Sequence, residues 1–110
     1  MPTPAPLFVD TFALCEWLLQ RLDQQAGALP QAVCNNALHL LEAVTLALKN
    51  RLRAERLDEA DERLIVLRVQ LRLAGAVGLL ADHQMLFALE CADRIGRQLG
   101  GWQRALDAAS

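Results

Sequence analysis

The sequence predicts an all-α protein that folds as an antiparallel up-down four-helix bundle. Three observations support this prediction: apolar residues recur at helical spacing in four stretches, no stretch alternates apolar and polar residues as a strand does, and the breaks between the stretches are short. The chain has 110 residues, which fits one domain. We place this domain at residues 7–110, after a flexible lead-in over residues 1–6 that is rich in proline.

The first helix is expected between this lead-in and a break at residues 26–30. Its apolar face follows the spacing i, i+4, i+7, i+11 and i+14 through Phe8, Phe12, Cys15, Leu19 and Leu22. Gly27 and Pro30 mark the break. A proline suits the first turn of the next helix, because a first-turn N–H has no partner within the helix.

The second helix is expected to be buried on more than one side. Its main apolar stripe consists of Val33, Ala37, Leu40, Val44, Leu48 and Leu52. Leu38, Leu41 and Leu46 widen this stripe. Such a broad apolar surface is typical of a bundle helix that also contacts a neighbouring subunit.

The third helix is expected where the charge changes sign, because cations suit the end of one helix and carboxylates the start of the next. Its stripe consists of Ala60, Leu64, Leu67, Leu71 and Ala74. The helix is expected to end between Gly75 and Gly78. A fourth helix follows near Asp82, with the stripe Met85, Leu89, Ala92, Ile95, Leu99, Trp102 and Leu106.

Three glycines lie inside the predicted fourth helix, at Gly96, Gly100 and Gly101. Each glycine costs a helix interior about 1 kcal/mol relative to alanine. We expect close packing against another helix or a neighbouring subunit to offset this cost. The three glycines and the adjacent Trp102 are therefore candidate helix-packing or subunit-interface residues.

Composition and charge indicate a binding protein rather than a basic nucleic-acid binder. Apolar residues make up 54% of the chain, which suggests apolar surface left for a partner or for self-association. The formal net charge is −2, although cations gather locally. The candidate nucleic-acid- or partner-binding residues are Lys49, Arg51, Arg53, Arg56, Arg68, Arg72, Arg94, Arg97 and Arg104. Pairs such as Glu90 and Arg94 are equally typical of a solvated helix face.

No catalytic residue, cofactor or resident metal is predicted. His39 and His83 lie on different helices without a paired metal-ligand spacing, and the three cysteines show no CxxC motif. A small-molecule or metal-binding bundle is the lowest-ranked hypothesis. The sequence shows no basic region before its first apolar stretch and no run of 18 apolar residues. These features predict a cytoplasmic protein with no membrane partner.

The third and fourth helices carry a family resemblance. The residues Arg63-Leu64, Leu67-Arg68, Leu71, Gly78-Leu79-Leu80, Gln84 and Ile95-Gly-Arg-Gln-Leu-Gly-Gly-Trp102 resemble the Avd family. These are the accessory variability determinants of diversity-generating retroelements, which belong with the ribosomal-RNA intervening-sequence proteins among small four-helix bundles. The resemblance implies a homopentameric ring with a central channel. It also implies a non-catalytic role in binding a reverse transcriptase and template RNA.

The chain departs from the basic character of this family at residues 31–36, which carry no charge. Each phosphate contact adds roughly 0.7–0.9 to the salt slope of nucleic-acid binding, so missing cations lower the expected affinity. The predicted function is therefore an Avd-like adaptor for a reverse transcriptase, with nucleic acid as a weaker partner. The alternative is a cytosolic scaffold or protein-interaction ring of the same superfamily without a nucleic-acid role.

Overall fold

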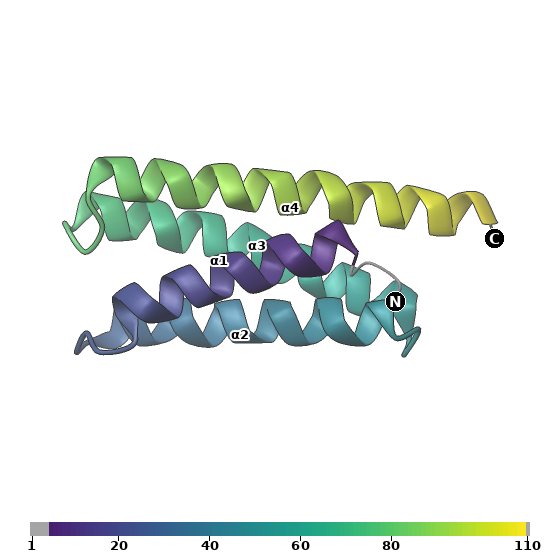
Figure 1. The fold of residues 1–110 in the computed structure, drawn as a ribbon, viewed down its shortest axis with the longest axis horizontal. Helices are drawn as coiled ribbons and strands as arrows, with labels where there is room; N and C mark the ends of the chain where they lie inside the picture. The colour runs from purple at the N-terminus through teal and green to yellow at the C-terminus, as the bar shows by residue number, and fades with distance from the viewer. Residues whose placement is uncertain (1–4, 110) are drawn as a thin grey trace.

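The computed structural model describes residues 5–109. This part of the chain forms four helices and no strand: α1 (Pro6–Leu22), α2 (Ala28–Leu48), α3 (Arg53–Ala76) and α4 (Asp82–Ala109). Each helix packs against the one before it, and α1 also packs against α4, so the four helices surround one core (Figure 1). The predicted all-α up-down bundle is confirmed. The expected lead-in lies mostly outside the described residues, and Pro6 is the first residue of α1.

The helix ends follow from local backbone chemistry. Gly27 before α2 has φ = 126° and Gly78 after α3 has φ = 79°, conformations that glycine adopts without the steric cost of a side chain. At the start of α4, the amide of Ala81 donates a hydrogen bond of 2.9 Å to Oε1 of Gln84. This contact satisfies one of the N–H groups that a helix start leaves unpaired. The breaks predicted near Gly27 and Gly78 are therefore confirmed.

The core is built mainly of leucine and alanine. The predicted stripe of α3, from Ala60 to Ala74, is buried along its whole length. No helix in the described residues combines the length and apolar character needed to cross a bilayer. The largest fully buried side chains are Leu7, Leu14, Leu18, Leu22, Leu40, Leu57, Leu64, Leu67, Leu71, Leu80, Ile95 and Leu99.

The prediction for the inward face of α1 was wrong in part. Leu7, Leu14 and Leu18 lie in the core, whereas Phe12 is 48% exposed. Two apolar series at helical spacing share this helix, and spacing alone does not decide which one faces inward. Packing against α2 and α4 selects the leucine series and leaves the phenylalanines at its edge.

The predicted stripe of α2 is correct from Val33 to Val44 but extends too far. The helix ends at Leu48, and Leu52 is 67% exposed in the turn before α3. The reason is local: Asn50 and Leu52 both have positive φ, at 60° and 52°, so the backbone leaves the helical path. Leu38, expected to widen the buried stripe, is 44% exposed.

Asn36 is a polar residue within the apolar contact between α2 and α3. Its Nδ2 donates to the carbonyl oxygen of Arg63 at 3.0 Å and to Oε1 of Gln70 at 3.1 Å. The side chain is buried, and its Oδ1 has no hydrogen-bond partner in the described part of the chain. Because a buried amide needs partners, these contacts favour one register of α2 against α3.

Candidate partner-binding surfaces

The structure disperses the nine predicted binding cations over the length of the bundle. Four of them already make polar contacts within the chain. These contacts are Arg56–Glu59 at 3.0 Å, Arg68–Asp93 at 3.3 Å, Arg94–Asp10 at 3.8 Å, and a hydrogen bond of 2.8 Å from Arg53 Nε to the carbonyl oxygen of Ala47. Their side chains therefore have less freedom to meet a phosphate.

Five of the predicted cations lie at one end of the bundle, which we call the basic end: Lys49, Arg51, Arg53, Arg56 and Arg104. The guanidinium carbon of Arg53 lies 5.1 Å from the centre of the Trp102 ring. Arg104 lines a hollow of about 360 Å³ beside the first turns of α3. Asp58 and Asp107 line the same hollow, so the charge at the basic end is mixed.

The remaining cations lie elsewhere. Arg72 lines a hollow that it shares with Asp82 and Met85, near the turn between α3 and α4. Arg97 is exposed in the middle of α4. The predicted set therefore does not form one continuous basic surface.

The three glycines of α4 differ in their surroundings. A Cβ atom at Gly96 would lie 2.5 Å from Nη2 of Arg68 on α3. At Gly100 the nearest atom would be Nη1 of Arg104, at 3.1 Å and on the same helix. Gly101 has only Arg104 at 4.0 Å. Close approach to another helix of the same chain is thus a property of Gly96 and not of Gly100 or Gly101.

Trp102 is half-buried, with Arg53 beside its ring and an open apolar hollow next to it. Arg53 covers one part of its ring, as described above. The ring also borders an open, mostly apolar hollow of about 520 Å³, which is shared with Pro6, Leu7 and Gly101. Trp102 therefore packs partly on the core and partly beside open surface.

An exposed apolar stripe on α3 was not identified from the sequence. It consists of Ile65, Val66, Val69 and Leu73, whose exposed fractions lie between 48% and 60%. We call this stripe the α3 ridge. Its residues follow the spacing i, i+1, i+4 and i+8 on the side of α3 away from the core. This second apolar pattern at helical spacing is the feature of the sequence that could have indicated the exposed stripe.

A second exposed apolar surface lies between α1 and α2. It is a groove of about 250 Å³, lined by Phe12, Cys15, Glu16, Leu19, Gln20, Leu38 and Leu41. We call it the α1–α2 groove. Phe12 and Leu38 are its most exposed apolar residues.

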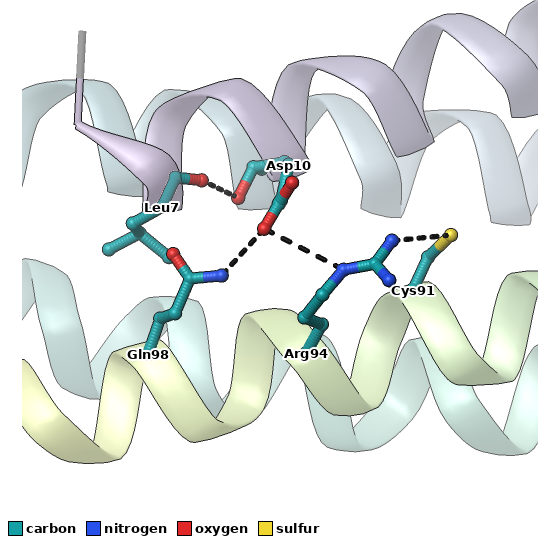
Figure 2. Close-up of polar contacts among 6 residues, drawn as sticks. Leu7, Asp10, Cys91, Arg94 and Gln98 are labelled. Carbon is teal, nitrogen blue, oxygen red and sulfur yellow. Dashed lines mark hydrogen bonds and ion pairs between the residues drawn. The ribbon is translucent and has the colours of Figure 1, made fainter. Parts of the chain in front are cut away.

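Polar contacts join α1 to α4 (Figure 2). Oδ2 of Asp10 accepts a hydrogen bond of 2.6 Å from Nε2 of Gln98 and lies 3.8 Å from Nε of Arg94. Arg94 also contacts the sulfur of Cys91 at 3.7 Å. Nearer the other end of α1, the rings of Trp17 and Phe87 lie 5.2 Å apart.

The thiols are shielded rather than activated. Burial raises the pKa of Cys15 to about 12, and its Sγ lies 3.0 Å from the carbonyl oxygen of Ala37. Burial also raises the pKa of Cys34, with Asp23 adding to the effect. Burial raises the pKa of Cys91 as well, although Arg94 opposes this rise. Residues 5–109 contain no group of three or more His, Cys, Asp or Glu side chains placed to hold a metal ion.

Comparison with known families gives one match. A family model described as bAvd-like matches residues 11–106. The matched region begins in α1 and ends in α4, so it includes residues of all four helices. Comparisons with curated proteins and with solved structures gave no match.

Proposed function

The chain belongs to the bAvd-like family, and from this membership we propose that it is a non-catalytic adaptor in a diversity-generating retroelement. In this proposal it acts in the cytoplasm as a homopentameric ring and binds a reverse transcriptase. The family match carries the adaptor role, and the structural observation that supports assembly is the pair of exposed apolar surfaces, the α3 ridge and the α1–α2 groove.

Those surfaces support assembly because of the cost of leaving them in water. Burial of apolar area contributes roughly 25 cal/mol per Å², and contiguous exposed apolar patches mark interaction sites in soluble proteins. On the α3 ridge, four aliphatic side chains are about half exposed. Contact with another protein chain would remove this area from water.

Template RNA is the weaker partner in this proposal. The basic end carries Lys49 and Arg51 in the turn before α3, and Arg53 lies beside the ring of Trp102. Cations together with an aromatic ring suit single-stranded nucleic acid. However, the chain has a net charge of −2, and acidic residues line the neighbouring hollow. Both features lower the attraction for phosphate.

A scaffold ring without nucleic acid is the second candidate function. The ion pairs of Arg56, Arg68 and Arg94 with neighbouring carboxylates favour it, because they engage cations that would otherwise face a phosphate backbone. This candidate shares the ring and the apolar surfaces with the first. It differs in the partner that the ring binds.

Co-purification with a reverse transcriptase encoded beside this chain, which the proposal requires, tests the adaptor role. We expect the tagged protein to retain the enzyme through size-exclusion chromatography, and light scattering of the adaptor alone to give about five times the chain mass of 12.1 kDa. A reverse transcriptase that elutes separately would contradict the adaptor role. A monomer at all concentrations would contradict the ring.

An RNA titration separates the two candidate functions. The adaptor role with template RNA predicts binding at low salt that weakens steeply as salt increases. Binding no stronger than that of an unrelated acidic protein of similar size would favour the scaffold function.

A further inference from the structure

We propose that the subunits meet head to tail, with the α3 ridge of one copy seated in the α1–α2 groove of the next copy. This inference rests on the oligomer of the proposed function. It adds which two surfaces form the contact and in which direction.

The two surfaces lie in different parts of the bundle and cannot meet within one chain. The α3 ridge lies on the side of α3 away from the buried residues Leu64, Leu67 and Leu71. The groove lies between α1 and α2, and α1 makes no helix contact with α3 in the described residues. A second copy is therefore needed to bring ridge and groove together.

Their shapes and side chains are complementary. The ridge is a row of aliphatic side chains projecting from one helix, with valine at positions 66 and 69. The groove is a concave apolar surface between two helices, with Phe12, Leu19 and Leu38 in its lining. Such a groove is a common docking site for the apolar face of a helix.

The charges beside the two surfaces give the contact a direction. Glu16 lines the groove, and Glu42 lies one helical turn after Leu38. The ridge has Glu62 before its first residue and Arg72 near its last residue. Glu16, Glu42 and Arg72 are exposed and make no ion pair among the described residues. An orientation that brings Arg72 to the two groove carboxylates keeps Glu62 away from them.

Symmetry favours this pairing over contact between two ridges. A two-fold contact joins the same patch on both subunits, whereas a closed ring with an odd number of subunits requires two different patches. Ridge-to-ridge contact would also leave Phe12 and Leu38 of both grooves exposed. In a closed ring, head-to-tail contact covers both apolar surfaces of every copy.

Two single variants and their mixture test the inference. Val69→Glu alters the ridge and Leu38→Glu alters the groove, at positions that are 60% and 44% exposed, so we expect both variants to fold. Each variant alone is expected to elute as a monomer. Their equimolar mixture is expected to give a one-to-one heterodimer, because one chain keeps an intact groove and the other keeps an intact ridge.

Leu52→Glu is the matched control for Leu38→Glu, since Leu52 is an exposed leucine in the turn before α3, outside both surfaces. This control should assemble like the wild type. Far-UV circular dichroism checks the fold, and Val69→Ser with Leu38→Ser repeats the test if a glutamate variant unfolds.

The outcomes separate this inference from the proposed function. Suppose that the wild type and Leu38→Glu both form oligomers while Val69→Glu stays monomeric. This result would establish ridge-to-ridge contact and overturn the head-to-tail arrangement. A mixture that stays monomeric at high protein concentration would overturn it as well. A monomeric wild type would overturn the oligomer itself.

Discussion

At Gly96, the absence of a side chain gives the guanidinium of Arg68 a place to cross from α3 to α4. Arg68 reaches Asp93 by an ion pair of 3.3 Å and the carbonyl oxygen of Ala92 at 3.5 Å. A Cβ at Gly96 would also lie 3.3 Å from Cδ2 of Leu64. This glycine therefore lowers the helix propensity of α4 but leaves room for the contacts of Arg68 between α3 and α4.

A double-mutant cycle between Gly96 and Arg68 tests this exchange. In an Arg68→Ala background, we expect Gly96→Ala to raise the free energy of unfolding by about 1 kcal/mol, the gain in helix propensity. In the wild type the gain should be smaller, because the new methyl group displaces the guanidinium. Urea denaturation measures both changes, and equal gains in the two backgrounds would show that Arg68 does not need the glycine.

Gly100 and Gly78 form a contrasting pair. Gly100→Ala meets only the flexible end of Arg104 and should stabilise the bundle by about 1 kcal/mol. Gly78→Ala should destabilise it by about 1 kcal/mol, since the residue has φ = 79°. Thermal denaturation of the two variants gives the signs, and a loss of stability for Gly100→Ala would point to a close contact in the assembled protein.

The raised pKa of Cys15 predicts slow thiol chemistry. At pH 8 we expect iodoacetamide to label Cys15 more slowly than Cys34 or Cys91, and all three to react quickly in denaturant. Mass spectrometry of peptides reports the order. Rapid labelling of Cys15 in the native protein would contradict its burial.

The same pKa predicts how stability changes in alkali. The folded protein holds the Cys15 proton more tightly than the unfolded chain, whose thiol has a pKa near 9.0. Stability from this group is therefore complete below pH 9 and is lost as pH rises towards about 12. A Cys15→Ala variant should lose less of its stability over this range.

At the scale of the helices, Asp10 provides polar contacts between α1 and α4, in addition to the apolar packing of the two helices. The carboxylate lies between Gln98 and Arg94, which are separated by one turn of α4 (Figure 2). Hydrogen bonds to a charged group contribute about 1.5–3 kcal/mol when well buried, and partial exposure lowers this contribution. The attachment of α1 thus depends on polar contacts as well as on leucine packing.

Asp10→Ala is expected to lower the free energy of unfolding by about 1 kcal/mol, through loss of the contact with Gln98. Asp10→Asn should lose less, because its amide oxygen still accepts from Gln98. A Gln98→Ala variant completes the double-mutant cycle, measured by urea denaturation. Additive effects of Asp10→Ala and Gln98→Ala would show that the hydrogen bond contributes nothing.

For the whole molecule, the surfaces available to partners differ in their chemistry. The α3 ridge and the α1–α2 groove are apolar, whereas the basic end carries cations and Trp102. Apolar contacts respond weakly to ionic strength, and phosphate contacts respond strongly. Salt therefore distinguishes assembly from nucleic-acid binding.

We expect the oligomer to persist when salt is raised from about 0.1 to 0.5 M, a range over which the Debye length shortens from about 10 to 4 Å. Over the same range, RNA binding at the basic end should fall by at least tenfold. Light scattering measures the mass of the oligomer, and fluorescence anisotropy of a labelled RNA measures RNA binding. Dissociation of the oligomer by salt would show that ion pairs, rather than the apolar ridge, hold the subunits together.

The number and order of the helices and the inward face of α3 could be predicted from the amino-acid sequence alone. These properties depend on local chemistry: helical spacing and glycines that tolerate positive φ. The expected charge change does not mark the boundary between α2 and α3, because α3 begins at Arg53 and so carries cations in its first turns, and α2 has no basic residue in its last turn. The family was also recognisable from Ile95–Trp102 and the other residues of the third and fourth helices that carry the resemblance. The family match confirms this prediction.

The packing of the helices against one another was needed to establish which of two apolar series on α1 faces inward and which apolar residues stay exposed. Phe12, Leu38 and Val69 are as apolar as their buried neighbours, so their exposure depends on where the adjacent helices lie. The same holds for the arginines, whose partners such as Asp93 come from another helix. Helical spacing is a property of one segment, whereas burial and pairing are properties of segments brought together by folding.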